Sequence, residues 1–149
     1  MLPTELGQLS TLQCLDIGMN AFNGTLGGLT AALTLLGIYI NFLTGMLPSE
    51  LWRITDMYGF CVHDNRFSGP LPTELGQFPA VTELYVNDNS FTGTLPTEVG
   101  QLTALSVLMV RNNSLTGTLP TELGRMTTTM TLLTVDTNYF HGDVACQQR

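Results

Sequence analysis

The chain has 149 residues, of which 44% are hydrophobic and 11% are charged, and its formal net charge is −7 with five arginines and no lysine. This length and hydrophobic content suffice for one domain with a sizeable core. Because phosphate binding needs clustered positive charge, the composition argues against a nucleic-acid partner.

A heptapeptide is the first feature along the chain, and four more copies of it follow. It reads LPTELGQ from Leu2, LPSELWR from Leu47, LPTELGQ from Leu71, LPTEVGQ from Leu95 and LPTELGR from Leu119. Proline suits the start of a helical turn, and the helix dipole favours glutamate in the first turn. Each copy therefore predicts a one-turn helix, which the glycine closes in every copy except the one from Leu47, where Trp52 stands in its place.

An L-x-L pattern in every unit predicts a short strand with one buried face. The pairs expected to point inward are Leu15/Ile17, Leu36/Ile38, Phe60/Val62, Leu84/Val86, Leu108/Val110 and Leu133/Val135. We expect a single parallel sheet with one strand per unit, centred near the second member of each pair.

Each predicted strand is followed by an asparagine and then by a glycine. The asparagines are Asn20, Asn41, Asn65, Asn89, Asn113 and Asn138, and the glycines are Gly24, Gly45, Gly69, Gly93, Gly117 and Gly142. An amide both donates and accepts hydrogen bonds, so the asparagine can satisfy backbone groups of neighbouring coils. The glycine permits a tight bend.

The spacing of these signals predicts a single repeat domain over residues 1–149 with about six units. Their limits are 1–25, 26–46, 47–70, 71–94, 95–118 and 119–149. The second unit is short and lacks the Pro-x-Glu sequence. Since residue 1 stands directly before a repeat and no signal peptide is visible, we expect a fragment of a longer array.

The frame LPxELGxLxxLxxLxLxxNxFxGx resembles the plant-type leucine-rich repeat family, and it is similar to receptor-like and inhibitor-like repeat proteins of plants and diatoms. The resemblance covers the whole chain. It implies an α/β solenoid, a right-handed superhelix with a concave parallel sheet and short convex helical turns. It also implies an extracellular or cell-surface domain, reaching a membrane only through segments outside this chain.

The outward residues of the predicted strands form the candidate ligand-binding surface. A diagonal of residue types enriched at interfaces crosses it: Tyr39, His63, Tyr85, Met109 and Arg111. We expect Tyr39 and Tyr85 to anchor a partner and Arg111 to hold an acidic group by bidentate hydrogen bonds. Asn87, in the same column as His63, is expected to face solvent.

Other candidate sites carry less chemistry. Cys61 and His63 share a strand face without a third ligand nearby in sequence, so we predict no metal, no cofactor and no catalytic residue. Two N-x-S/T sequences, at Asn23 and Asn112, are candidate glycosylation sites for a secreted chain.

The leading functional hypothesis is a non-enzymatic module that recognises a protein or peptide on its concave face. The alternative is a structural or surface-active protein, ice-binding or wall-associated, because threonines such as Thr94 and Thr118 recur in phase. An uncharged stretch over residues 26–47 is long enough to span a bilayer. It keeps the repeat phase at Leu36 and Asn41, which favours the solenoid.

Overall fold

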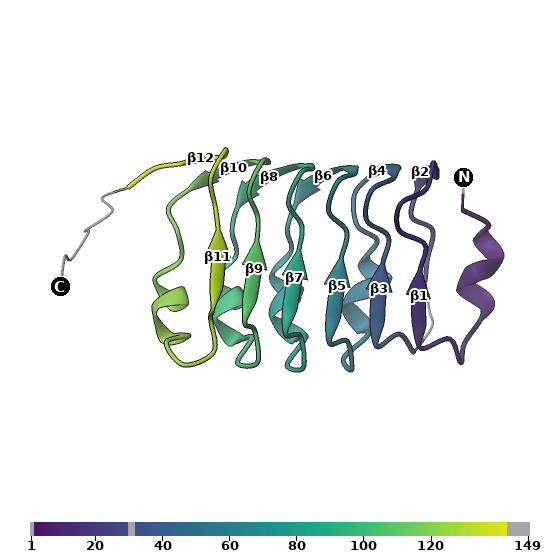
Figure 1. Ribbon diagram of the computed structural model, residues 1–149, viewed down its shortest axis with the longest axis horizontal. Coiled ribbons are helices and arrows are strands. Elements are labelled where there is room, and N and C mark those ends of the chain that lie inside the picture. The colour runs from purple at the N-terminus through teal and green to yellow at the C-terminus, as the bar shows by residue number, and fades with distance from the viewer. Residues whose placement is uncertain (1, 30–31, 143–149) are drawn as a thin grey trace.

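The computed structural model describes residues 2–29 and 32–142, which wind into a solenoid of stacked coils (Figure 1). The strands on one long side form a parallel sheet in the order β1-β3-β5-β7-β9-β11. We call it the first sheet. Its strands are β1 (Cys14–Asp16), β3 (Leu35–Gly37), β5 (Gly59–Cys61), β7 (Glu83–Tyr85), β9 (Val107–Met109) and β11 (Leu132–Thr134).

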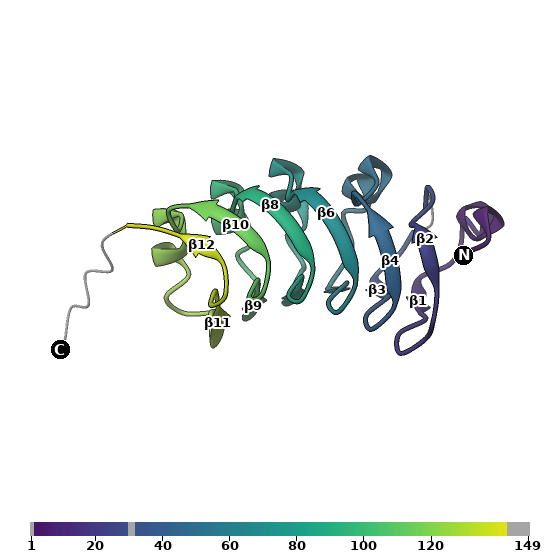
Figure 2. The ribbon, with the colours of Figure 1, turned by 90° about the horizontal axis from the view of Figure 1, so that it is seen from above.

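The helices lie on the opposite side of the coils, along the outer side of the bend (Figure 2). All are 3-10 helices: η1 (Thr4–Gln8), η2 (Ser49–Arg53), η3 (Thr73–Gln77), η4 (Thr97–Gln101) and η5 (Thr121–Arg125). The predicted solenoid, with its parallel sheet and short helical turns on opposite sides, is therefore confirmed. No helix within residues 2–29 or 32–142 is long and apolar enough to cross a bilayer.

The strands of the first sheet begin earlier than predicted. Each is centred on the first member of the L-x-L pair, for example on Leu84 and not on Val86. Regular pairing ends before the second member because the backbone then turns into the left-handed region within three residues, at Asp88 in this coil. Single backbone hydrogen bonds still continue the ladder, such as Val86 N–H to the Met109 carbonyl at 3.0 Å.

A second parallel sheet, in the order β12-β10-β8-β6-β4-β2, was not predicted. Its strands are β2 (Asn23–Thr25), β4 (Phe42–Gly45), β6 (Arg66–Pro70), β8 (Ser90–Thr94), β10 (Ser114–Gly117) and β12 (Tyr139–Phe140). It contains the glycines expected to form bends, and their φ values of 77° to 83° from Gly24 to Gly117 confirm that requirement. These segments are rich in Gly, Ser and Thr and lack an alternating apolar pattern, so they gave no strand signal.

The core consists of apolar layers stacked between the two sheets and the helices. The predicted inward pairs are confirmed in the middle coils, where Leu84, Val86, Leu108 and Val110 have no exposed surface. Burial declines at the last described coil, where Leu133 is 39% exposed. In a solenoid each coil is covered only by its neighbours, so a terminal coil leaves part of its apolar layer open.

The repeated asparagines form a ladder along the inside of the turn that leaves the first sheet. Asn113 is typical: its Nδ2 donates to the carbonyls of Val86, Val110 and Arg111, at 3.0 to 3.2 Å. Its Oδ1 accepts the Phe91 N–H at 2.9 Å. Asn41, Asn65, Asn89 and Asn138 repeat this pattern. The predicted role of these amides, which satisfy backbone groups of two coils at once, is confirmed.

The heptapeptide forms the expected helical turn with two differences in detail. The proline lies just before the helix in an extended conformation, as Pro96 does with φ −65° and ψ 140°. The glycine does not close the turn through a left-handed conformation. A Cβ built on Gly100 would lie 2.4 Å from the Cβ of Glu122 in the next coil, so glycine is needed there for close packing of neighbouring helices.

Candidate ligand-binding face

The candidate surface is the outward side of the first sheet together with the turns that follow its strands. We call it the concave face and describe it by columns that run across the coils. The first strand column consists of Cys14, Leu35, Gly59, Glu83, Val107 and Leu132. The second strand column consists of Asp16, Gly37, Cys61, Tyr85, Met109 and Thr134. The third column lies just beyond the strands and consists of Gly18, Tyr39, His63, Asn87, Arg111 and Asp136. The fourth, which we call the turn column, consists of Met19, Ile40, Asp64, Asp88, Asn112 and Thr137.

Three of the predicted site residues form a continuous aromatic row. The rings of Tyr39 and His63 are stacked, with centroids 5.0 Å apart and an interplanar angle of 8°. Tyr85 meets His63 edge-on, at 5.7 Å and 66°. Gly18 makes room for this row, because a Cβ there would lie 2.4 Å from Cζ of Tyr39. Stacked and edge-to-face rings are favourable arrangements, so the row presents a fixed apolar edge to the face.

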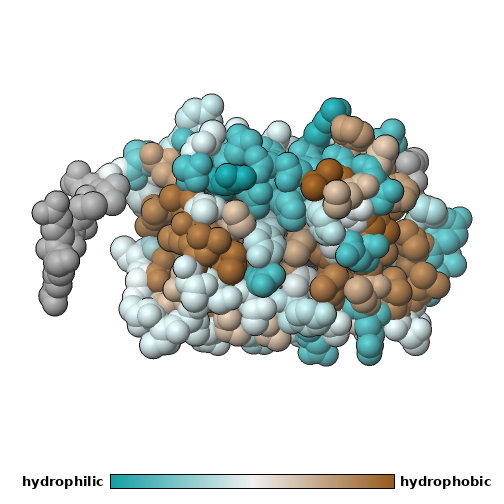
Figure 3. All heavy atoms as spheres, viewed as in Figure 1, coloured by the Kyte–Doolittle hydropathy of each residue, from teal (hydrophilic) through white to brown (hydrophobic). Residues whose placement is uncertain are grey.

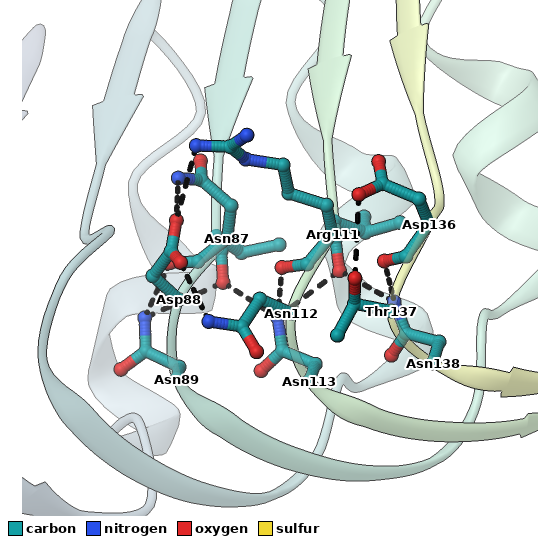
Figure 4. A network of polar contacts seen from close by, with 11 residues as sticks. Asn87, Asp88, Asn89, Arg111, Asn112, Asn113, Asp136, Thr137 and Asn138 are labelled. Atoms are coloured by element: carbon teal, nitrogen blue, oxygen red, sulfur yellow. Dashed lines mark hydrogen bonds and ion pairs between the residues drawn. The ribbon is translucent and has the colours of Figure 1, made fainter.

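The other two predicted residues continue the face toward the C-terminus. Met109 pairs with Tyr85 across β7 and β9 and is half-buried. Arg111 lies one column further, and its Nη2 is 3.7 Å from Oδ2 of Asp88. Figure 4 shows the Arg111 side chain reaching back over Asn87 toward that carboxylate. Arg111 is 47% exposed, so a partner can still reach it, but an acidic group there has to compete with Asp88.

Asn87 does not face solvent as predicted, since only 4% of its surface is exposed. Its Nδ2 donates to Oδ2 of Asp88 at 2.7 Å, and its Oδ1 has no partner among the described residues. His63 Nδ1, in the neighbouring coil of the same column, is likewise covered and unpaired. Figure 4 shows the Arg111 side chain of the next coil lying over Asn87, an arrangement that the alternation of strand residues does not reveal.

The turn column beyond the aromatic row is a feature that sequence reasoning missed. Its six residues all adopt the left-handed conformation, with φ between 49° and 56°: Met19, Ile40, Asp64, Asp88, Asn112 and Thr137. Asp and Asn tolerate this region, and they occupy half of the column, which was the available signal. Ile40 is strained there because a β-branched side chain rarely adopts positive φ.

Carboxylates give the concave face a negative potential, and together with burial they shift the pKa values of its titratable groups. Burial, with Glu83 and Asp16 adding to it, raises the pKa of the Cys61 thiol to about 11. Burial also raises the pKa of Tyr85, and the Glu83 carboxylate raises it further. Burial lowers the pKa of His63 despite the opposing influence of Asp64 and Asp88, so the ring is neutral near pH 7.

Asp88 is the best-satisfied carboxylate on the face. Burial acts to raise its pKa, but hydrogen bonds from Asn112 and Asn87 and the nearby Arg111 charge outweigh burial and hold the pKa below its ordinary value. Both amides lie 2.7 Å from the carboxylate oxygens. Asp88 therefore stays ionised and fixes Arg111 over the middle of the face (Figure 4).

The surface of the concave face is apolar at both ends and hydrophilic between them. Figure 3 shows one apolar area over β9 and β11 and another over β1 and β3, separated by the surface of β7. Among the residues of the columns, Leu132 is 43% exposed at one end, and Leu35 is half-buried at the other. Glu83 on β7 is exposed between them.

The two glycosylation candidates occupy different environments. Asn23 is exposed on β2 of the second sheet, away from the concave face. Asn112 is exposed in the turn column, where its Nδ2 donates to Oδ1 of Asp88. A glycan on Asn112 would extend beside Arg111, so glycosylation there and ligand binding at Arg111 are competing uses of the same surface.

No group of three metal-ligating side chains occurs in the part of the chain that the structure describes. A surface cavity of about 370 Å³ lies on the helix side, lined by Ser10, Ala32, Leu33, Glu50, Arg53, Ile54, Thr55 and Asp56. It adjoins the coil in which the described residues between β2 and β3 form no helix. A polar cavity of about 320 Å³ adjoins the turn column, lined by Asn89, Asn112, Asn113, Ser114, Thr137, Asn138 and Tyr139.

Known proteins share both the repeat and the architecture. The sequence profile described as Leucine Rich Repeat matches residues 80–102 and 104–126. The chain is similar to the ectodomain of the plant membrane receptor kinase GASSHO1/SCHENGEN3 from Arabidopsis thaliana, solved in complex with CASPARIAN STRIP INTEGRITY FACTOR 2. Identity is 34% and the TM-score is 0.89, over 95% of this chain and 17% of that one.

Two further solved structures extend the comparison. PEPR1-AtPEP1 matches at 33% identity and a TM-score of 0.85, over 93% of this chain and 20% of that one. A plant ice-binding protein matches at 23% identity and a TM-score of 0.78, over 85% of this chain and 42% of that one, which is a likeness of fold alone. The chain thus spans a minor part of each of these proteins. A comparison with curated protein sequences found no match.

Proposed function

We propose, on the premise that this chain is a leucine-rich-repeat solenoid similar to plant receptor ectodomains, that it is a non-enzymatic module for recognising a peptide or a protein loop. The observation that carries the proposal is the aromatic row Tyr39–His63–Tyr85 on the concave face. Aromatic side chains contribute much of the binding energy at protein interfaces. The row is held by ring contacts, so little conformational entropy is lost when a partner docks.

The size of the face suits an extended partner. Its six strands are spaced about 4.8 Å apart, which gives a strip about 25 Å long. The similar ectodomain of GASSHO1/SCHENGEN3 was solved in complex with CASPARIAN STRIP INTEGRITY FACTOR 2, and the second similar structure is PEPR1-AtPEP1, which supports the same class of activity here. Because the first of these is the ectodomain of a membrane receptor kinase, we also propose an extracellular or cell-surface location for this chain, with a glycan at Asn23.

The test is a pull-down from extracts of the source tissue with the wild-type protein and a Tyr39→Ala/Tyr85→Ala variant. We expect the wild type to retain partners that the double variant loses. A Tyr58→Ala/Tyr139→Ala variant is the matched control, because both of these tyrosines are exposed but lie outside the concave columns. If the Tyr39/Tyr85 variant keeps the same partners with its circular dichroism unchanged, the concave site is wrong.

Ice binding is the second candidate, supported by the fold of the plant ice-binding protein and by threonines on the second sheet. Thr25, Thr94 and Thr118 are exposed at equivalent positions, each beside the glycine of the next coil, except where Met46 and Pro70 interrupt the column. Two positions of the column therefore carry no threonine, and the array is not continuous. Thermal hysteresis measured on the purified protein distinguishes this candidate from peptide recognition.

A further inference from the structure

Resting on the proposed function, we propose that the partner is an extended cationic peptide with basic side chains about four to five residues apart and an apolar residue between them. The first argument is charge. The columns of the concave face contain five carboxylates, at Asp16, Asp64, Glu83, Asp88 and Asp136, and one guanidinium, at Arg111. That guanidinium is already engaged by Asp88, so the unmatched charge on the face is negative.

The second argument is the position of two carboxylates near the two ends of the aromatic row, one on the strand before Tyr39 and one on the strand of Tyr85. Asp16 lies on β1, and its Oδ1 accepts the Gly18 N–H at 3.1 Å. A Cβ on Gly37 would lie 3.0 Å from this same oxygen, so the Asp16 carboxylate leans over β3. Glu83 lies on β7, next to Tyr85, and is exposed. Opposite charges attract strongly at a partly desolvated surface, so these two carboxylates suit ammonium or guanidinium groups.

The third argument is spacing. β1 and β7 are separated by three strand intervals, which is about 14 Å at 4.8 Å per interval. Asp16 is in register with Tyr85, and Glu83 lies two residues earlier on β7, which adds about 6.6 Å along the strand. An extended peptide rises about 3.3 Å per residue, so basic residues that reach Asp16 and Glu83 are about four to five positions apart. The residue midway between them falls over β3 and β5, beside Tyr39 and Cys61, where an apolar side chain is favoured.

The experiment is a selection from a phage-displayed library of random decapeptides against the wild-type protein. Counter-selection with the Tyr39→Ala/Tyr85→Ala variant removes peptides that bind elsewhere. We expect the retained peptides to be enriched in Lys and Arg at a spacing of about four to five residues, with an apolar residue between. Retained peptides that are acidic or neutral would overturn the charge inference while leaving the proposed function intact. If no retained peptide depends on the two tyrosines, the proposed function fails as well.

A charge-matched pair of variants then locates the effect. Asp16→Asn/Glu83→Gln removes two charges from the concave face, and Glu98→Gln/Glu122→Gln removes two from the helix side. For a selected peptide, measured by fluorescence polarisation, we expect the first pair to weaken binding at least about tenfold, which is the loss of one charge pair of about 1.4 kcal/mol. The second pair should stay within about twofold. Equal losses of affinity in the two double variants would show that only the net charge of the protein matters, and would overturn the proposed site at Asp16 and Glu83.

The thiol pKa of Cys61 measures the electrostatic effect of Asp16 and Glu83 in the absence of a peptide. In a Cys14→Ser/Cys146→Ser background, the pH profile of maleimide labelling should follow a pKa of about 11. Adding Asp16→Asn/Glu83→Gln should move the profile to lower pH, because both carboxylates disfavour the thiolate. Adding Glu98→Gln/Glu122→Gln should not. An unmoved profile in the first variant would show that Asp16 and Glu83 do not act on the centre of the face.

Discussion

Residues 26–46 and residues 95–118 form two coils of the solenoid that share the asparagine ladder and differ most on the helix side. Residues 95–118 contain η4, whose Gly100 packs tightly against Glu122 of the next coil. The described part of residues 26–46 contains no helix, and a Cβ on Gly27 would meet nothing within 4 Å. Yet Asn41 and Asn113 are equally buried and make the same hydrogen bonds. The asparagine ladder and the sheets therefore define the coil, and the helix is replaceable.

The largest expected effect is loss of a ladder asparagine. Asn41→Ala and Asn113→Ala should each destabilise the protein by about 3 kcal/mol, because several backbone groups lose their partner inside the protein. Denaturant midpoints at constant m-value measure this change. Asn87→Ala is the matched control: it is also buried but makes one side-chain hydrogen bond, so we expect less than about 1 kcal/mol. Tolerance of Asn41→Ala alone would break the comparison.

Substitution of the helix glycines should separate the two coils. Gly100→Ala places a methyl group 2.4 Å from Cβ of Glu122, so we expect a loss of about 2 kcal/mol from overpacking. Gly27→Ala meets open space and reduces the entropy of the unfolded chain, so it should be neutral or stabilising by about 0.5 kcal/mol. Equal effects in thermal unfolding would mean that the helix side is packed alike in both coils.

The left-handed column offers a reciprocal exchange between the coils. Ile40→Asn should stabilise by about 1 kcal/mol, since asparagine tolerates a φ near 49° and Ile40 is 43% exposed. Asn112→Ile should destabilise by at least as much, because it introduces strain and removes the hydrogen bond to Asp88. Unchanged stability in both variants would show that the turn carries no strain.

The smallest expected effect is the pH dependence of stability that arises from the contact between Tyr39 and His63 in neighbouring coils of the concave face. Tyr39 stacks on His63, whose pKa burial lowers, so the unfolded chain binds that proton more readily. Stability is then full above pH 6.5 and declines as the pH falls below it. The Arg111–Asp88 pair, with a lowered carboxylate pKa, should lose stability only below pH 3.8.

The measurement is the melting temperature between about pH 7.5 and pH 5 for the wild type and for His63→Gln. We expect the wild type to lose more stability than the variant over this interval. His141→Gln, at an exposed histidine, should behave like the wild type. Parallel curves for all three proteins would remove His63 as the acid-sensitive contact.

Most of the fold was predictable because the repeat assigns one physical task to each position. The inward pairs, the ladder asparagines and the positive-φ glycines were identified from residue type and spacing. The second sheet was not, since its strands pair through backbone groups while Gly93 and its neighbours Thr92 and Thr94 show no apolar alternation. Backbone pairing without a side-chain pattern leaves no trace in a single sequence.

The candidate face was predictable in part. The strand phase placed Tyr39, His63 and Tyr85 in neighbouring coils, but their ring geometry depends on Gly18, whose role appears only in three dimensions. The burial of Asn87 also escaped prediction, because the Arg111 side chain that lies over it comes from the next coil (Figure 4). Met19 and Ile40 adopt the same left-handed conformation without a polar side chain, which shows that the stacking of the coils, and not the local residue preference, determines this turn.

The two parallel sheets have a mechanical consequence. Their strands lie across the long axis of the solenoid, so the hydrogen bonds between coils run along that axis (Figure 1). Every contact between elements joins adjacent coils, which connects the coils in series. A force that pulls the two ends apart loads each set of bonds along its length, and the weakest junction opens first while the others stay closed. Under tension, the solenoid is therefore expected to unfold one coil at a time.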